Sequence, residues 1–86
     1  MSTTVREIAE ASTYGQAYTR LLGELVVELR AATTLARPAR RVANARIDGM
    51  RRGLLAILQA EHFMTEDYAA SVILTHAGTY SERRGQ

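Results

Sequence analysis

The sequence predicts an all-α protein: a long antiparallel helical hairpin followed by a short third helix. Apolar residues recur at spacings of three and four along two long stretches, and the only proline separates these stretches. No segment alternates apolar and polar residues as a strand does. At 86 residues the chain is expected to form one domain over residues 1–78, followed by a flexible tail over 79–86.

The first helix is expected over residues 4–35. Gly15 lies on its apolar stripe, and we interpret it as a point of close approach by a neighbouring helix in preference to a hinge. Leu21 and Val27 fall outside the stripe, so the apolar surface is wider than one helix contact needs. A third helix of the same chain or a second subunit would cover it. The stripe consists of Ile8, Ala11, Gly15, Tyr18, Leu22, Leu25, Val26 and Leu29.

The second helix is expected over residues 38–62. Proline suits the first turn of a helix and disfavours helical geometry in the residue before it, so Pro38 begins this element. Two long amphipathic helices joined by so short a connection should pack antiparallel. The apolar seam of the second helix has heptad-like spacing and consists of Ala39, Ala43, Ile47, Met50, Leu54, Ile57 and Glu61.

The third helix is expected over residues 65–77. Thr65 is a good N-cap residue, and Glu66 and Asp67 would complement the helix macrodipole in the first turn. Gly78 is the predicted C-terminal cap. The polar sequence that follows predicts the flexible tail.

Positive charge is concentrated in the second helix. Every one of the 11 basic residues is arginine, and residues 36–60 carry six Arg and one Asp, a net charge of +5 in a chain of net +2. At 100° per residue, five of these arginines share a face about 130° from the apolar seam, while Arg46 borders the seam and is expected to snorkel or form an ion pair. The candidate partner-binding residues are Arg37, Arg40, Arg41, Asn44, Arg51 and Arg52.

Three interpretations of this face compete. It is a solvated surface on which Asp48 pairs with Arg41, Arg51 or Arg52, because runs of charge usually face water. Alternatively, it binds an acidic protein, with apolar neighbours such as Leu55 completing the contact. In the third interpretation it follows a phosphate backbone, with an amide touching a base edge.

The third predicted helix weakens the nucleic-acid interpretation. A helix-turn-helix protein reads DNA with its second helix, but Thr65–Ala77 contains no Arg, Lys, Asn or Gln and begins with two acids. DNA binding would therefore have to use the second helix, with a dimer supplying two basic faces.

Catalysis, cofactors and metals find no support in the sequence. There is no cysteine, and His62 and His76 match no metal-ligand spacing, so no catalytic, cofactor-binding or metal-binding residue is assigned. The longest apolar run, Leu54–Leu58, is far too short to span a bilayer, and a membrane-surface role is disfavoured. The first residues lack the pattern of a secretory signal, so a cytoplasmic location is expected.

A chain of this size is marginally stable alone, so burying an apolar face against a second copy is a substantial gain. We therefore expect a homodimer that forms a helical bundle. The sequence favours a small non-enzymatic regulatory or inhibitor-type protein that binds an acidic protein through the arginine face. Binding of nucleic acid, in particular DNA, through the same face is the alternative.

Overall fold

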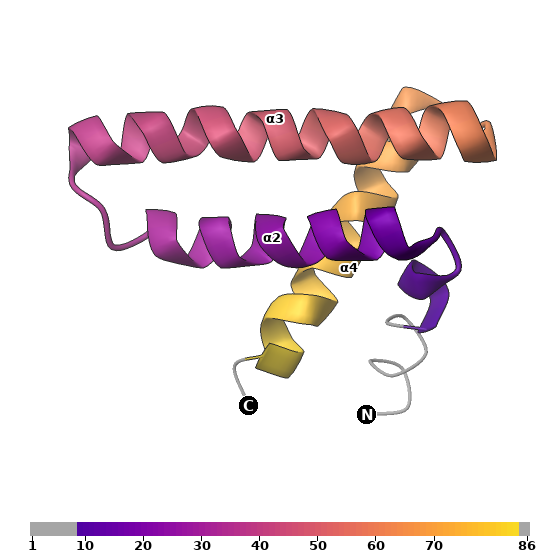
Figure 1. Cartoon of the computed structure of the whole chain (residues 1–86), viewed down its shortest axis with the longest axis horizontal. Helices are drawn as coiled ribbons and strands as arrows, with labels where there is room; N and C mark the ends of the chain where they lie inside the picture. Colours follow the sequence, from indigo (N-terminus) through magenta and orange to yellow (C-terminus); the bar gives the residue numbers. More distant parts are fainter. Residues whose placement is uncertain (1–8, 85–86) are drawn as a thin grey trace.

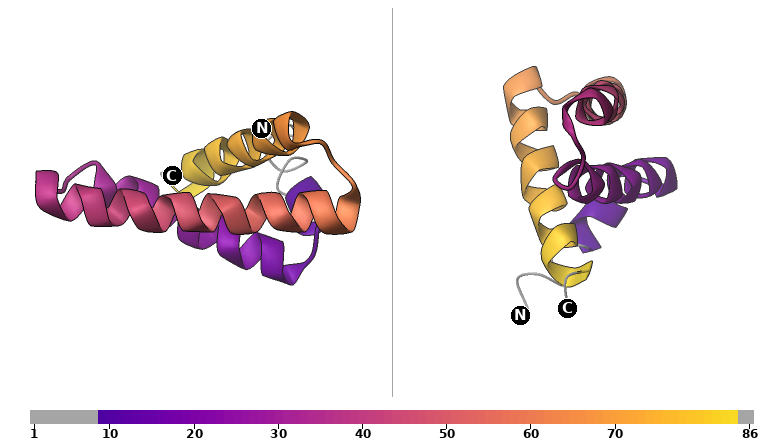
Figure 2. Two further views of the ribbon diagram at one scale, coloured as in Figure 1. Left: turned by 90° about the horizontal axis from the view of Figure 1, so that it is seen from above. Right: turned by 90° about the vertical axis from the view of Figure 1, so that its left-hand side faces the viewer.

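The computed structural model describes residues 9–84 and is helical almost throughout. Its helices are α2 (Gln16–Ala32), α3 (Arg37–His62) and α4 (Glu66–Arg84), and residues 9–12 are also helical. No strand occurs within 9–84, which confirms the all-α class. Helices α2 and α3 lie side by side and run in opposite directions, and α4 crosses them obliquely (Figure 1). The end-on view in Figure 2 shows α4 on one side of both helices.

The expected first helix, residues 4–35, is interrupted at Gly15. This residue has φ 104° and ψ 165°, a backbone conformation essentially restricted to glycine, and α2 begins at the next residue. A Cβ added at Gly15 would meet nothing within 4 Å. The interpretation of Gly15 as a point of close approach is therefore wrong: the glycine is required by a change in chain direction. The predicted helix start at residue 4 lies outside the described residues.

Helix α3 agrees with the expected limits of 38–62. Pro38 lies in its first turn, and the helix ends at Phe63, whose φ of 55° is left-handed. The amide of Met64 donates a hydrogen bond to the carbonyl oxygen of Leu58 at 3.2 Å, which satisfies one of the carbonyls left free at a helix end.

Helix α4 begins as predicted and ends later. The amide of Tyr68 donates to Oγ1 of Thr65 at 3.3 Å, which confirms Thr65 as the N-cap residue. Gly78 does not end the helix, so the predicted helix end at residue 77 is wrong: residues 79–84, which were expected to belong to a tail, continue α4. Thr79 is buried and Tyr80 is half-buried against the core, and this packing outweighs the poor helix propensity of glycine.

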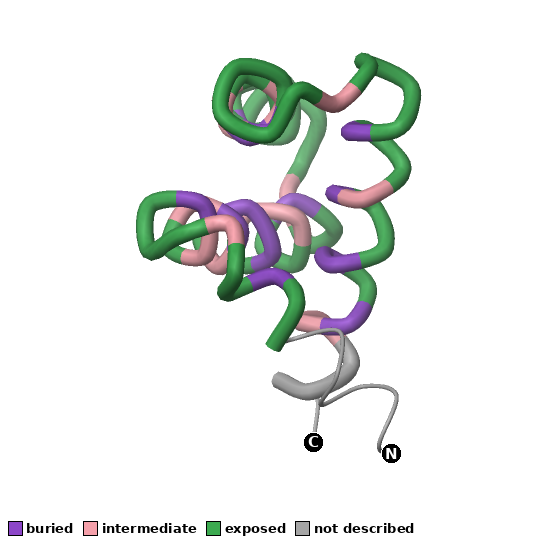
Figure 3. The backbone as a smooth tube through the Cα atoms, turned by 90° about the vertical axis from the view of Figure 1, so that its right-hand side faces the viewer, coloured by how far each residue is buried: buried purple, intermediate pink, exposed green. Residues whose placement is uncertain are grey.

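The core lies where the three helices meet, and its buried positions face inward on each of them (Figure 3). Most of the first predicted apolar stripe is buried, with Gly15 exposed. Of the second, Ala43, Ile47 and Leu54 are buried. Met50 and Ile57 are half-buried, and Ala39 and Glu61 at its ends are exposed. Leu58, which was not placed in the seam, is fully buried. Buried core residues on these helices include Tyr18, Leu22, Leu25, Val26, Ala43, Ile47, Leu54, Leu58, Ala69, Ile73 and Ala77.

The two other helices of the chain cover part of the wide apolar surface of α2. A Cβ added at Gly53 of α3 would lie 3.0 Å from Cδ2 of Leu21, so the two helices pack closely there. On the other side, Tyr18 of α2 reaches His76 of α4. Leu21 is therefore half-buried by α3, whereas Val27 remains 50% exposed on the outward side of α2.

Candidate functional site

The six residues proposed as partner-binding are all exposed along α3, and the structure brings four of them together. Two predicted residues, Arg51 and Arg52, lie farther along the helix. An open depression of about 480 Å³ lies at the N-terminal end of α3 and is lined by Arg37, Pro38, Arg40, Arg41 and Asn44.

Arg40 supports the fold in addition to lining this depression. Its Nε donates to the carbonyl oxygen of Ala32 at 3.2 Å, and its Nη2 donates to that of Thr33 at 3.3 Å. These carbonyls stand at the C-terminal end of α2, where backbone acceptors lack helical partners and the macrodipole is negative. The guanidinium of Arg40 therefore ties α3 to the last turn of α2.

Two ion pairs neutralise part of the arginine charge. Nε of Arg52 lies 3.0 Å from Oδ2 of Asp48, which agrees with the expectation that Asp48 pairs with an arginine of this face. Arg46 lies 3.5 Å from Glu28, as expected for a residue that borders the seam. Both pairs are solvent-exposed in whole or in part, so each contributes roughly 0.2–1 kcal/mol to stability.

Three arginines of the face make no ion pair or side-chain hydrogen bond with the described part of the chain: Arg37, Arg41 and Arg51. The first turn of α3 contains no acidic residue, and Asp48 is the first acid after its start. The positive end of the helix macrodipole adds to the positive potential there. The N-terminal half of α3 is thus a strongly basic surface with hydrogen-bond donors available to a partner.

An apolar depression adjoins this basic surface. It has a volume of about 350 Å³ and shares Arg40 and Asn44 with the first depression. The sequence placed Leu55 beside the arginines, but Leu55 is half-buried against the core. The apolar neighbours come instead from both α2 and α3, because the turn between them brings residues 29–33 beside 40–47. The lining residues are Leu29, Ala32, Thr33, Arg40, Asn44 and Ile47.

A second cluster combines two tyrosines and two histidines. The hydroxyl of Tyr18 lies 2.8 Å from Nδ1 of His76, and the ring of Tyr14 lies edge-on to His62 with centroids 4.9 Å apart. Burial, followed by the nearby Tyr14 and Tyr80, raises the pKa of Tyr18. A buried phenol with a raised pKa is a poor proton donor or nucleophile near neutral pH. This cluster joins α2 to α4.

Sequence analysis did not detect this cluster because Tyr18 and His76 are 58 residues apart. Only the placement of Tyr18 on the apolar stripe signalled its burial. Among residues 9–84, no group of three His, Asp or Glu side chains is arranged to hold a metal ion.

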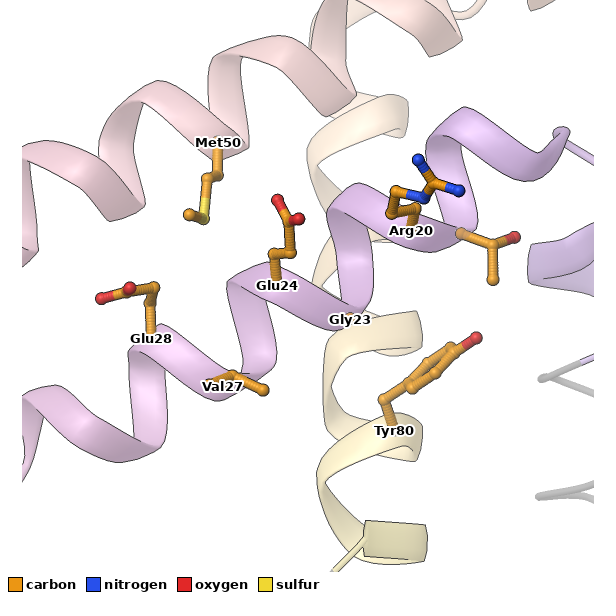
Figure 4. A pocket seen from close by; sticks show the side chains of 8 residues that line it. Arg20, Gly23, Glu24, Val27, Glu28, Met50 and Tyr80 are labelled. Atoms are coloured by element: carbon orange, nitrogen blue, oxygen red, sulfur yellow. The ribbon is translucent and has the colours of Figure 1, made fainter.

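A further depression, of about 510 Å³, lies on the outward face of α2 (Figure 4). Met50 of α3 flanks it on one side and Tyr80 of α4 on the other, while Glu24 and Arg20 stand on α2 itself (Figure 4). Glu28, also at its edge, is paired with Arg46. Its opposite charges are dispersed around an apolar centre, so the arrangement resembles a protein surface more than a catalytic site.

Known proteins offer no guide to this chain: no family model, characterised protein or solved structure matches it. Within residues 9–84, none of the helices combines the length and apolarity that crossing a lipid bilayer requires.

Proposed function

We propose that this chain is a small non-enzymatic regulatory or inhibitor-type protein that binds an acidic protein through the basic face of α3. The observation that carries the proposal is a concentration of exposed arginines beside an apolar depression. Within the described part of the chain, three of them have no ion pair or side-chain hydrogen bond: Arg37, Arg41 and Arg51. Protein interfaces commonly combine arginine with apolar contacts. A surface that only faces water does not require an apolar depression beside its arginines.

The arginine face would contribute both to the affinity for an acidic partner and to the rate of association with it. Arginine can donate two parallel hydrogen bonds to one carboxylate, and such charge-assisted bonds are stronger than neutral ones. The positive potential at the start of α3 would also accelerate encounter with an acidic surface, in a manner that salt weakens. Arg40 and Arg52 contribute less, because the first is bonded to α2 and the second to Asp48.

Nucleic acid is the alternative partner, because its phosphates could also contact this basic face. The experiment below distinguishes it from an acidic protein. Three arginines that have no partner among residues 9–81, on one convex helix, would neutralise few phosphates.

The test compares a triple charge reversal, Arg37→Glu, Arg41→Glu and Arg51→Glu, with the single reversal Arg20→Glu on α2. Proteins cross-linked to the unaltered chain would be identified by mass spectrometry and purified, and their affinity measured by titration calorimetry. We expect the triple variant to bind on the order of 100-fold more weakly, and Arg20→Glu to bind normally. Equal affinity of the triple variant would refute the proposal. Retardation of duplex DNA or RNA at 50 mM salt, lost in the triple variant, would instead assign the face to nucleic acid.

A further inference from the structure

Helix α4 leaves the turn end of the α2–α3 hairpin without a third helix. It crosses α2 and α3 nearer their opposite end, as two perpendicular views show (Figure 1 and Figure 2). The apolar depression of about 350 Å³ lies at the turn end, and the described residues that line it come from α2, from α3 and from Thr33 after α2. Apolar surface therefore stays open to water there, next to the basic face of α3.

Arginines stand on both sides of this depression along α3. Arg41 lies six residues before Ile47, about 9 Å along the helix axis, and Arg51 lies four residues after it, about 6 Å. At 100° per residue both arginines are within about 60° of Asn44, which lines the depression. Within residues 9–81 neither arginine has an ion pair or a side-chain hydrogen bond. Their guanidinium groups are therefore available to a ligand on either side of the apolar surface.

The apolar depression and the basic depression form one continuous site. Arg40 and Asn44 line both of them. The bonds that Arg40 donates to the carbonyl oxygens of Ala32 and Thr33, at 3.2 and 3.3 Å, hold its guanidinium in place at the boundary. A partner thus meets a boundary that is already ordered, which reduces the entropy lost on binding.

We propose that this combined site recognises one large apolar side chain with carboxylates on both sides of it, in an extended segment of the partner protein. The inference rests on the proposed function and names the feature of the acidic partner that the face selects. The apolar side chain enters the depression beside Leu29 and Ile47, and the carboxylates accept hydrogen bonds from Arg41 and Arg51. Because an extended chain rises about 3.3 Å per residue, these carboxylates stand two or three residues from the apolar anchor.

The apolar part of the site sets the register of the segment. Arginines spaced along a helix would accept a purely acidic chain in several positions, whereas one depression admits one anchor. Its volume of about 350 Å³ is near the lower end of the range for small-molecule sites, which suits a single large side chain. An acidic segment without such an anchor would leave the depression open to water.

Three synthetic peptides test both parts of the site on the intact chain. The first has a central Phe between three Glu on each side, the second has Ala in place of Phe, and the third has Gln in place of every Glu. Each is titrated into ¹⁵N-labelled protein, and the affinity is obtained from the shifts of backbone amide signals. We expect a dissociation constant on the order of 0.1–1 mM for the first peptide and about tenfold weaker binding of the other two.

The same spectra locate the contact. The largest shifts caused by the first peptide should fall on Leu29, Thr33 and Asn44, which line the apolar depression. Gly23 and Val27 line the depression on the outward face of α2 and should shift little. Largest shifts at Gly23 and Val27 would place the peptide elsewhere and overturn the inference.

A pair of tryptophan substitutions tests the depression from the protein side. Asn44→Trp sets a large ring over the apolar surface and should weaken the first peptide at least fivefold. Ala39→Trp introduces the same ring at an exposed position of α3 that lines a different depression, and should change the affinity less than twofold. Circular dichroism checks that both variants remain helical. Equal affinities of the two variants would contradict binding in the depression.

The outcomes separate this inference from the proposed function. Equal binding of the Phe and Ala peptides would overturn the inference and leave recognition of acidic proteins standing. Equal binding of the Glu and Gln peptides, or no binding of any peptide at several millimolar, would also overturn it. The proposed function is decided separately, by the affinity of the triple charge-reversal variant for the cross-linked protein.

Two further probes test other occupants of the site. Dodecanoate carries a carboxylate on an acyl chain, and a single-stranded oligonucleotide carries phosphates beside flat bases. Both should compete with the first peptide only at concentrations well above that of the peptide. Displacement of the peptide by an equal concentration of either probe would assign the site to that class of ligand and overturn the inference.

Discussion

The hydroxyl of Tyr18 on α2 lies 2.8 Å from Nδ1 of His76 on α4, and both side chains are almost completely buried. This contact joins α2 to α4 through two residues that are 58 positions apart in the sequence. It is a buried, directional polar link between α2 and α4, in addition to the hydrogen bonds that Arg30 of α2 donates to Ser81 of α4.

Tyr18→Phe should therefore destabilise the fold by about 1–2 kcal/mol. The substitution preserves the ring and removes the hydrogen bond that Nδ1 of His76 makes with the hydroxyl, which leaves a buried polar atom with one partner fewer. Urea denaturation followed by circular dichroism measures the change. Tyr68→Phe is the control, because Tyr68 is exposed and should change stability by less than 0.5 kcal/mol. Equal effects of both variants would show that the buried bond contributes nothing.

Stability should fall as pH rises above 10. Burial raises the pKa of Tyr18 above its ordinary value of 10.0, so the unfolded chain loses the phenolic proton at a lower pH than the folded chain. The contribution is complete below pH 10 and is lost progressively above it, by at most about 1.4 kcal/mol at pH 11 for this one group. Burial also raises the pKa of Tyr14, which acts in the same direction.

Urea denaturation at pH 8 and pH 11 checks this dependence. Tyr18→Phe should lose less stability between the two pH values than the unaltered chain. A variant with the same alkaline loss would exclude Tyr18 as its source.

Two glycine substitutions should change the stability of the fold in opposite directions. Gly15→Ala forces a side chain into a conformation that is essentially restricted to glycine and should cost about 1–3 kcal/mol. Gly49→Ala lies in the interior of α3, where a Cβ meets nothing within 4 Å, and should stabilise by about 0.5–1 kcal/mol. Thermal unfolding of both variants measures the difference. Stabilisation by both substitutions would mean that Gly15 is not held in its positive φ.

Phe63→Gly should stabilise the chain by about 1 kcal/mol. Phe63 adopts a left-handed conformation that glycine occupies without strain, and its ring is 89% exposed, so little packing is lost. The midpoint of urea denaturation should increase at constant slope. A decrease would show that the phenyl ring makes a stabilising contact that outweighs the strain.

The sequence identified the elements that depend on local chemistry. Pro38 and the periodicity after it predicted α3 closely, and Thr65 predicted the start of α4. The end of α4 depends on tertiary contacts instead. Glycine at 78 and the polar residues after it signal a helix end, but burial of Thr79 and Tyr80 against the core continues the helix.

The break at Gly15 shows a different limit of predicting helices from the sequence. The apolar stripe continues across it from Ala11 to Tyr18, so periodicity alone cannot distinguish one helix from two segments that meet the same core. The sequence also located the arginines on one helix. It could not show that Arg40 bonds to Ala32 and Thr33, because this requires the turn between α2 and α3 to be formed.

The bonds of Arg40 to the end of α2 divide the basic face into positions with different freedom to change in evolution. Replacing Arg40 alters the turn as well as the surface, so selection for folding acts on it whatever the partner. The described fold does not depend in this way on the side chains of Arg37, Arg41 and Arg51. Related chains could therefore acquire new partners through these three positions while the helical scaffold beneath them stays the same.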